Sequence, residues 1–432
     1  MTEFIPVIVL IISFLSLLAI GTPVAWSIAI ASMLTMMVSI PAIPAFTTIA
    51  QRMGTGLDSF ALLAIPFFIL SGELMNKGGI AHRLIAFAKT LVGALPGGLA
   101  LINIIAAMLM GAIAGSAMAS ASAMGSILGP EMEKDGYSKE FGAAVNITSS
   151  TIGLVIPPSN VLIIYSLASG GVSIAALFLA GYIPGILTGL FLMVIASIWA
   201  KKKNYKLGKR SSLKEVIKTF VNAFPSLLLL VVVIGGIVVG IFTATEASAI
   251  AVLYTLVLGF MYKEISFKKL PGILLDSSAT TAIVMLLIGA SMSMSWVLSY
   301  ENIPQDISTG LLSLSDNKIV ILLIINLLLL FVGIFMDMTP AVLIFTPIFL
   351  PVVTALGMDP VHFGIIMVLN LCIGLCTPPV GSVLFVGVSI AKTTIEKVVK
   401  PLVPLFLAMI FALFLITYFP QISLWLPSLF GL

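Results

Sequence analysis

Long apolar blocks, separated by short polar segments, run through the chain from end to end. Residues 141–200 contain no Asp, Glu, Lys or Arg. A helix needs about 20 apolar residues to cross a hydrocarbon core of roughly 30 Å, so the pattern predicts an all-α polytopic membrane protein. A transmembrane β-barrel would show a weaker, alternating pattern. The charge-poor blocks are residues 4–20, 23–40, 59–76, 99–130, 141–170, 172–199, 219–242, 247–262, 277–299, 319–357, 361–391 and 401–419.

The composition strengthens this interpretation. Apolar residues make up 60% of the 432 positions and charged residues 9%, whereas a soluble globular chain carries about 25% charged residues. This balance excludes a water-soluble enzyme. No GxxxxGK[ST] motif indicates ATP hydrolysis, and no His, Ser or paired Asp pattern indicates an intramembrane protease. Cys372 and Cys376, four residues apart, are both expected to be small apolar fillers. The two His residues are too few for a metal site.

The basic residues predict an orientation. Segment 201–218 contains eight basic residues and one acidic residue, which places it in the cytoplasm. If blocks 99–130 and 319–357 are re-entrant hairpins and every other block crosses once, all basic residues except Arg52 and Lys318 are cytoplasmic. Treating the two hairpins as single crossings would place basic segments on opposite sides of the membrane. We therefore expect two re-entrant hairpins and both termini on the side opposite the cytoplasm.

An internal repeat organises the chain. IGLVIPP at residues 152–158 matches IGLCTPP at residues 373–379, an offset of 221. Segment 57–59 likewise matches 275–277. Each half would then hold five crossings and one hairpin, and because five is odd the halves must face opposite ways. Inverted-topology repeats with broken helices in matching positions are typical of secondary transporters that bind substrate near the bilayer midplane.

The hairpins and the Pro-Pro breaks are the candidate binding centres. Hairpin arms of about 15 residues are too short to cross, so their turns lie at depth, with Asp337 in the second repeat expected at the position equivalent to Gly115 in the first. Consecutive prolines free backbone carbonyls that suit Na⁺, and the half-helices that follow present N–H groups that suit a carboxylate. Asp337 fits two roles, as a ligand that helps hold Na⁺ or as the N-cap of the second arm.

We expect two such centres, related by the repeat, with Na⁺ as the only metal and no organic cofactor. The first centre would comprise Gly115, Ser116, Ser120, Asn146, Ser149, Ser150, Ile156, Pro157, Pro158, Ser159 and Asn160. The second would comprise Asp337, Thr339, Asn370, Cys376, Thr377, Pro378, Pro379, Gly381 and Ser382. Outside these sets, Asp58 and Asp276 precede apolar runs as expected helix N-caps, and Glu73 and Glu246 lie near span ends where they would cap, pair or snorkel.

At these residues the chain resembles a known family. The segments that carry the resemblance are GTPVAWSIAIAS, IGLVIPPSNVLIIYSLASG, GIFTATEASAIAVLY, GIFMDMTPAVLIFTPIFLPV, LGMDPVHFGIIMVLNLCIGLCTPPVGSVLF and KVVKPLVP. They are similar to the large membrane subunit of TRAP (tripartite ATP-independent periplasmic) transporters. The resemblance implies an elevator-type, Na⁺-coupled importer of organic acids in a bacterial inner membrane. It also implies two partners, a small four-helix membrane subunit, expected as a separate polypeptide, and a periplasmic substrate-binding protein; no nucleic acid is expected.

This organisation predicts five regions. Residues 1–98 would form scaffold helices and an amphipathic arm, residues 99–199 the hairpin, broken helix and last span of the first transport half, and residues 200–218 a cytoplasmic basic linker. Residues 219–318 and 319–432 would repeat the scaffold and transport parts. A sialic-acid-like sugar acid is slightly preferred over a C4-dicarboxylate, because no second buried cation is seen for a second carboxylate. A stand-alone Na⁺/dicarboxylate symporter of the same architecture, or less readily a channel, remains the alternative.

Overall fold

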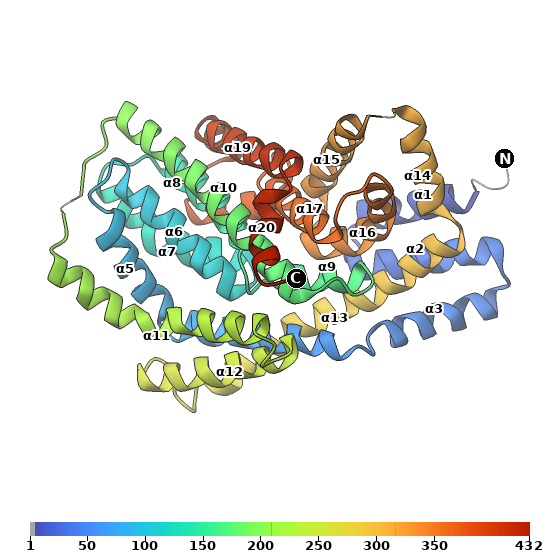
Figure 1. Ribbon diagram of the computed structural model, residues 1–432, viewed down its shortest axis with the longest axis horizontal. Helices are drawn as coiled ribbons and strands as arrows, with labels where there is room; N and C mark the ends of the chain where they lie inside the picture. The colour runs from blue at the N-terminus through green and yellow to red at the C-terminus, as the bar shows by residue number, and fades with distance from the viewer. Residues whose placement is uncertain (1–4, 209, 316) are drawn as a thin grey trace.

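The computed structural model describes residues 5–208, 210–315 and 317–432, without the side chains of residues 112–114. These residues form helices joined by short turns (Figure 1). The first half contains α1 (Ile5–Ala19), α2 (Val24–Ser39), α3 (Ala42–Gly56), η2 (Phe60–Leu63), α4 (Ala64–Lys77), α5 (Ile80–Val92), α6 (Gly98–Ala114), α7 (Ala117–Lys134), α8 (Lys139–Ile152), α9 (Asn160–Ala168) and α10 (Ile174–Lys202). The second half contains α11 (Leu213–Val238), α12 (Ala244–Met261), α13 (Leu270–Tyr300), α14 (Ile303–Leu314), α15 (Lys318–Phe335), α16 (Met338–Ala355), α17 (Pro360–Gly374), α18 (Ser382–Ile390), α19 (Ile395–Tyr418) and α20 (Gln421–Leu429).

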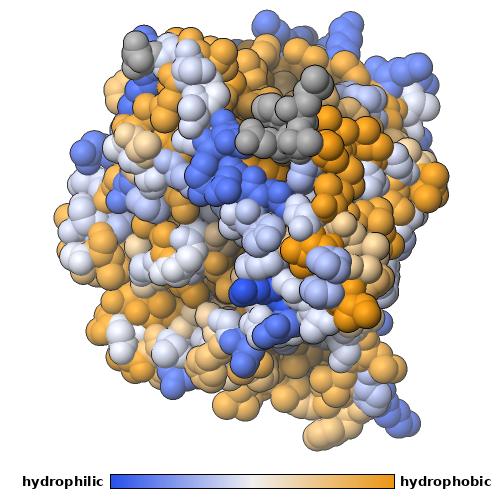
Figure 2. Space-filling model, turned by 90° about the vertical axis from the view of Figure 1, so that its right-hand side faces the viewer, coloured by the Kyte–Doolittle hydropathy of each residue, from blue (hydrophilic) through white to orange (hydrophobic). Residues whose placement is uncertain are grey.

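Eight helical segments within the described residues are long and apolar enough to cross a membrane. They are η2 with α4, α10, α11, α12, α13, α15, α16 and α19. Many of their large apolar side chains point outward, and broad orange patches on the face shown in Figure 2 reflect this surface. Such patches suit contact with lipid tails better than contact with water. The predicted all-α multi-pass membrane protein is therefore confirmed.

Both long blocks fold as pairs of helices, as expected for hairpins, but α15 and α16 have 18 residues each and are long enough to cross a membrane, so the expected arm length of about 15 residues is wrong for the second block. α6 and α7 meet at Gly115, and α15 and α16 meet at Met336. Figure 1 shows α6, α7 and α8 together on the left and α15, α16 and α17 to the right of the centre. The expected match of Asp337 with Gly115 is wrong by one residue, because Asp337 and Ser116 each occupy the N-cap of the second arm.

Both Pro-Pro segments interrupt a helix, as the sequence predicts. Seven residues separate the end of α8 from the start of α9, and this irregular segment contains Pro157 and Pro158. α17 and α18 are separated in the same way around Pro378 and Pro379. α6, α7 and α8 pack together, as do α15, α16 and α17. The chain thus presents two similar groups of helices in the same order.

Each broken helix lies very close to the adjacent hairpin. A Cβ atom built on Gly153 would lie 2.4 Å from the Cα atom of Gly111. In the second group, a Cβ atom on Gly374 would lie 2.5 Å from the Cα atom of Gly333. These distances leave no room for a side chain, so glycine at both positions permits direct backbone packing.

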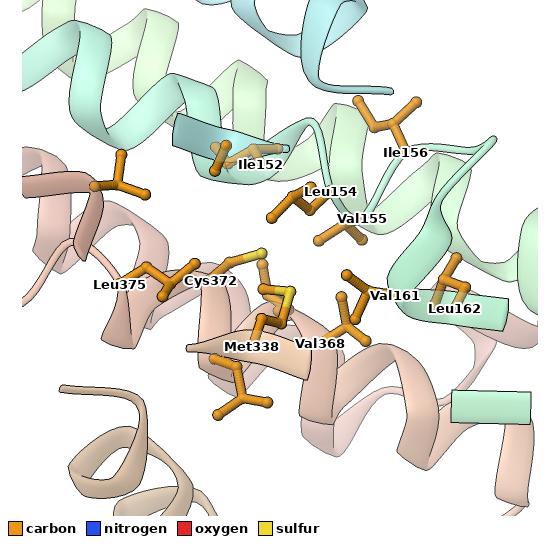
Figure 3. Close-up of a cluster of buried hydrophobic side chains, with 14 of the residues drawn as sticks. Ile152, Leu154, Val155, Ile156, Val161, Leu162, Met338, Val368, Cys372 and Leu375 are labelled. Atoms are coloured by element: carbon orange, nitrogen blue, oxygen red, sulfur yellow. The ribbon is translucent and has the colours of Figure 1, made fainter. Parts of the chain in front are cut away.

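A buried apolar cluster joins the two groups of helices. Leu154 and Val155 from the first break face Val368 and Cys372 of α17 (Figure 3). The thiol of Cys372 also donates a hydrogen bond to the carbonyl oxygen of Thr151, with a sulfur–oxygen distance of 3.0 Å. Both cysteines are fully buried and unpaired, which confirms that they fill apolar space.

The remaining long helices pack around these groups. α4 packs against α12, and α13 packs against α2, α3 and α4. Asp276 lies inside α13 and pairs with Lys77 at the end of α4, so the expected N-cap role of Asp276 is wrong. Asp58 is not a cap either, because Ser59 holds the N-cap position of η2. Glu246 does cap its helix, through a reciprocal capping box with Thr243.

Candidate functional site

A cavity of about 420 Å³ lies where both groups of helices meet α4 and α13. Its lining comes from both halves of the chain. The sequence analysis expected the residues of each half to form a separate centre, whereas residues of both halves line this one cavity. The lining residues are Ile65, Ile69, Gly72, Glu73, Asn76, Gly115, Ser116, Ala117, Met118, Ala119, Leu154, Asn160, Val161, Ile164, Thr280, Ile283, Val284, Asp337, Met338, Thr339, Leu375, Ser382 and Val383.

Four helix N-termini converge on this cavity. Ser116 and Asp337 are the N-caps of α7 and α16, and Asn160 and Ser382 are the first residues of α9 and α18. The first N–H groups of a helix have no intrahelical acceptor and carry a partial positive charge. The arrangement therefore suits a negatively charged group such as a carboxylate.

Polar side chains at these N-termini retain free bonding capacity. The buried hydroxyl of Ser382 makes no hydrogen bond to any described residue. Asp337 has the backbone geometry of an N-cap, but its carboxylate makes no capping hydrogen bond and is exposed to the cavity. By contrast, the hydroxyl of Ser116 accepts a hydrogen bond from the backbone N–H of Ala119 at 3.3 Å. Ser382 and Asp337 are therefore the side chains most available to a ligand.

The turn of the first hairpin depends on Gly115. This residue has a φ of +61°, in the left-handed region that favours glycine. A Cβ atom at this position would also lie 2.5 Å from the side-chain nitrogen of Asn160. The hairpin can thus approach the start of α9 only because residue 115 lacks a side chain.

The opposite wall adds polar residues that sequence reasoning missed. Glu73 and Asn76 project from one face of α4, three residues apart, and Thr280 comes from α13. The sequence placed Glu73 at a span end, where a cap or a surface ion pair is the commoner role. Its i, i+3 relation to Asn76 on an otherwise apolar helix was the available signal.

The charge in the cavity is entirely acidic among the described lining residues. Glu73 and Asp337 are the ionisable groups, and no Lys, Arg or His lines the cavity. Two carboxylates in a confined space repel each other and any anionic ligand unless cations compensate them. Bound cations would therefore be needed for an organic acid to enter.

Most other candidate residues from the sequence lie behind the cavity wall rather than on it. Several hydroxyls are already satisfied by carbonyl oxygens, with oxygen–oxygen distances of 2.7 Å for Ser149 to Val145 and 2.8 Å for Thr377 to Ile373. The candidates that do not line the cavity are Ser120, Asn146, Ser149, Ser150, Ile156, Pro157, Pro158, Ser159, Asn370, Cys376, Thr377, Pro378, Pro379 and Gly381.

Two of these buried residues keep oxygen atoms without a hydrogen-bond donor. The hydroxyl of Ser150, next to the first break, and the carboxamide oxygen of Asn370, before the second break, have no partner among the described residues. Neutral oxygen atoms are suitable ligands for a hard cation. Each breakpoint therefore offers oxygen atoms that fit Na⁺.

Asn146 does not line the cavity that contains the helix N-termini. Its side-chain nitrogen donates to the carbonyl oxygen of Ala121 at 2.7 Å, which ties α8 to α7. Asn146 lines a different cavity of about 340 Å³, together with Asn103, and its side-chain oxygen has no partner among the described residues. The structure thus separates Asn146 from the cavity that contains the four helix N-termini.

Comparison with known proteins places the chain among transporters. A relative from Salmonella typhimurium, named uncharacterized protein YgiK, is 57% identical, with 99% of this chain and 98% of that protein covered. The sialic acid TRAP transporter large permease protein SiaM of Vibrio cholerae is 39% identical, with 97% and 98% covered. The C4-dicarboxylate TRAP transporter large permease protein DctM of Rhodobacter capsulatus is 38% identical, with 97% and 98% covered.

The fold also has solved counterparts. The YdaH transporter of Alcanivorax borkumensis superimposes with a TM-score of 0.65, covering 86% of this chain and 87% of that chain, at 13% identity. At this identity the likeness concerns the fold alone. Residues 11–422 match the family model described as tripartite ATP-independent periplasmic transporter, DctM component. The chain therefore belongs to the DctM family, the large permease components of TRAP transporters, and is a membrane transport subunit rather than an enzyme.

Proposed function

We propose that this chain imports an organic acid by Na⁺-coupled secondary transport, as the large transmembrane subunit of a binding-protein-dependent TRAP transporter. One observation supports this most strongly: four helix N-termini and two carboxylates share a single cavity that no basic side chain of the described residues lines. The N-termini bind the substrate carboxylate, and Na⁺ ions offset the charges of Asp337 and Glu73. Entry of substrate therefore depends on Na⁺.

The Na⁺ ions bind at the two helix breaks. Ser150 and Asn370 supply oxygen atoms that lack donors, and backbone carbonyls freed by the Pro-Pro segments add further ligands. Asp337 acts from the tip of the second hairpin. H⁺ does not replace Na⁺, because neutral oxygen atoms rather than a proton relay surround the breaks.

The two groups of helices move together as one body. In this proposal the halves are inverted-topology repeats, and α6–α9 with α15–α18 form the mobile transport part of an elevator. α4 and α13 form part of the fixed scaffold and line one side of the cavity. The cavity lies at the boundary of both parts, where a sliding motion would carry the substrate from one side of the membrane to the other.

The transporter works with two partners, a small four-helix membrane subunit and a periplasmic substrate-binding protein. TRAP large permease components form such tripartite systems, and the match over nearly the whole chain supports the same assembly here. A stand-alone Na⁺/dicarboxylate symporter is the alternative. Uptake by reconstituted large and small subunits that requires no added binding protein would favour that alternative.

The substrate is a sialic-acid-like sugar acid in preference to a C4-dicarboxylate. The described lining contains no basic residue for a second carboxylate, whereas Glu73, Asn76 and Thr280 offer acceptors and donors to hydroxyl groups. Relatives of nearly equal identity are named for each substrate, so similarity does not separate the two. Binding measurements on the partner binding protein decide between them.

The test is uptake into proteoliposomes with the three components and a controlled Na⁺ gradient. In Asp337→Asn we expect the half-saturating Na⁺ concentration to rise severalfold, because a neutral amide holds a cation less well than a carboxylate. The control is Asp359→Asn, since the carboxylate of Asp359 accepts capping bonds from Val361 and His362 and Asn also caps well.

The outcomes separate the two roles of Asp337. An unchanged Na⁺ curve in Asp337→Asn would remove the Asp337 carboxylate from the Na⁺ site. Uptake that persists at full rate without Na⁺ but collapses with a protonophore would overturn Na⁺ coupling itself.

A further inference from the structure

A second large cavity lies between the first half of α5, the first half of α11 and the residues that follow α12. Its volume is about 500 Å³, and none of its lining residues lines the cavity of the hairpin tips. The lining residues are Gly79, His82, Arg83, Ala86, Thr219, Val221, Asn222, Pro225, Tyr262 and Glu264. Most of these side chains are polar, although the surrounding helices are apolar.

The cavity lies at the level where apolar helix surface gives way to polar residues. Tyr262 directly follows the last residue of the membrane-length helix α12. Beside the cavity, Phe220, Val221 and Phe224 of α11 expose large apolar side chains. A lipid headgroup occupies this level in a bilayer, and lipid tails would lie against the exposed apolar residues.

Arg83 is held in place with most of its bonding capacity unused. Its guanidinium carbon lies 3.6 Å from the centroid of the Tyr262 ring. One nitrogen, Nη1, donates to the carbonyl oxygen of Gly79 at 2.7 Å. A guanidinium has five N–H donors, and within the described residues this is its one hydrogen bond. The group is thus positioned to donate to a phosphate.

The Tyr262 hydroxyl adds a second unused group. It is buried and has no hydrogen-bond partner among the described residues, and Tyr262 is one of the residues that line the same cavity. A buried polar group without a partner costs free energy, so such groups are normally satisfied by something. Together, the hydroxyl and the guanidinium present several donors to one space.

Glu264 supplies an acidic group beside Arg83. A Cβ atom on Gly79 would lie 2.8 Å from Cγ of Glu264 and 3.0 Å from Nη1 of Arg83, so glycine lets both side chains approach. The ion pairs of the described residues do not include Glu264 with Arg83. The cavity therefore offers a cation and an anion that are close but not paired with each other.

We propose that this cavity binds the headgroup of a phosphoethanolamine-type phospholipid. The phosphate diester accepts hydrogen bonds from Arg83 and from the Tyr262 hydroxyl, and the ammonium group donates to Glu264. The acyl chains run along the exposed apolar side chains of α11. The bound lipid fastens α5 to α11 and α12.

Thermal unfolding of the delipidated, detergent-purified full chain tests the proposal. Phosphatidylethanolamine far above its dissociation constant should raise Tm by about 5 °C. Phosphatidylcholine and phosphatidylglycerol with the same acyl chains should raise Tm by less than half as much, because the first lacks N–H donors and the second lacks the ammonium group. Inorganic phosphate and soluble phosphoethanolamine, at equal concentration, should have no effect without the acyl chains.

Tyr262→Phe is the decisive variant, since it removes an unpartnered hydroxyl and keeps the ring under Arg83. It should fold as well as the parent in plain detergent and lose at least half of the lipid-dependent rise in Tm. Tyr254→Phe is the matched control, because the Tyr254 hydroxyl already donates to the carbonyl oxygen of Pro225 at 2.7 Å. That variant should have a lower basal Tm and an unchanged response to lipid.

Three outcomes would overturn the proposal. They are a full lipid response in Tyr262→Phe, an equal rise with phosphatidylcholine or phosphatidylglycerol, and an equal rise with inorganic phosphate, which would assign the cavity to free phosphate. A loss of preference for phosphatidylethanolamine in Glu264→Gln would support the assignment of the ammonium group.

Discussion

Single residues decide whether the hairpin and the broken helix can form one binding cavity. Gly115 combines a left-handed φ with a close approach to Asn160. Gly115→Ala therefore causes both backbone strain and a steric clash with the Asn160 side chain. We expect a loss of stability of about 2–4 kcal/mol and loss of Na⁺-dependent uptake. Gly170→Ala provides the control, because Gly170 has a φ of +82° with no atom within 4 Å of the added Cβ.

The comparison of these two variants isolates the close approach. Gly170→Ala should show only the backbone cost of about 1–2 kcal/mol and retain uptake. Both variants are measured by thermal unfolding in detergent and by uptake in proteoliposomes. Equal effects of the two substitutions on uptake would show that contact with Asn160 is unimportant.

A substitution at Ser382 tests the role of the cavity without lowering the stability of the folded protein. The buried hydroxyl of Ser382 has no partner, so Ser382→Ala should leave Tm unchanged or slightly raised. If the hydroxyl bonds to a charged ligand, its loss should raise the half-saturating concentration of substrate or Na⁺ about 10- to 100-fold. Ser149→Ala is the control, because the Ser149 hydroxyl bonds to its own helix at 2.7 Å. A wild-type uptake curve for Ser382→Ala would remove Ser382 from the site.

The sequence could mark the region of the site but not which side chains face the ligand. The Pro-Pro motifs located both helix breaks, and Gly115, Ser116, Asn160, Asp337, Thr339 and Ser382 do line the cavity. The hydroxyls of residues such as Ser149 and Thr377 instead bond to carbonyl oxygens one helical turn earlier. The amino-acid sequence does not show whether such a hydroxyl bonds to its own helix or to a ligand. Glu73 was missed because a polar residue near a helix end has several ordinary roles.

At the scale of elements, each broken helix is held by backbone contact with its hairpin. Gly374→Ala would place a Cβ atom 2.5 Å from Gly333 Cα, and helix backbones cannot shift as a flexible side chain can. We expect α15 and α17 to separate, with a loss of about 1–3 kcal/mol. Gly235→Ala, in α11 with no atom within 4 Å, should lower stability by no measurable amount.

Thermal unfolding of the two variants, with and without Na⁺, gives the measurement. Because Asn370 lies one turn before Gly374, the stabilisation by Na⁺ should also fall in Gly374→Ala. A Tm equal to that of Gly235→Ala would show that the helices tolerate the added methyl group.

Helices and breaks could be predicted where a local sequence pattern determines them. They could not be predicted where tertiary contacts determine the local conformation. The hairpins and breaks follow from block length and proline position. The segment Leu-Asp-Ser occurs in both halves, yet it ends α3 in a turn and lies inside the continuous helix α13. In α13 the carboxylate of Asp276 pairs with Lys77 of α4, a contact between distant parts of the chain. Because the three residues are identical in both halves, they cannot determine why one copy forms a turn and the other a continuous helix.

At the scale of the whole molecule, the two halves complete one cavity that neither half contains alone. The internal repeat predicted matching parts but placed them in two centres. Only the packing of α9, α16 and α18 around a common space shows that the N-termini converge. Long-range packing of this kind leaves no trace in the spacing of motifs within one half.

The orientation of the whole molecule in the membrane is a prediction from its basic residues. Segment 201–218 is expected in the cytoplasm and Arg52 in the periplasm, because single crossings and two re-entrant hairpins place nearly all basic residues on one side. Lys206 and Arg52 are both exposed, so cysteines at these positions can react with an impermeant maleimide. Cys372 and Cys376 are fully buried, which keeps background labelling low.

Lys206→Cys should therefore label only in inside-out vesicles and Arg52→Cys only in intact spheroplasts. The side chain of Arg52 lies over Trp296, 4.8 Å from the ring centroid, and its loss should cost about 0.5–1 kcal/mol without changing the topology. Both variants should retain uptake, which verifies that the labelled protein is native. Labelling of Lys206→Cys in intact spheroplasts would invert the orientation, and labelling of both positions from one side would require one hairpin to cross the membrane. The second result would also remove the inverted relation of the two halves on which the proposed elevator depends, because one half would then cross the membrane an even number of times.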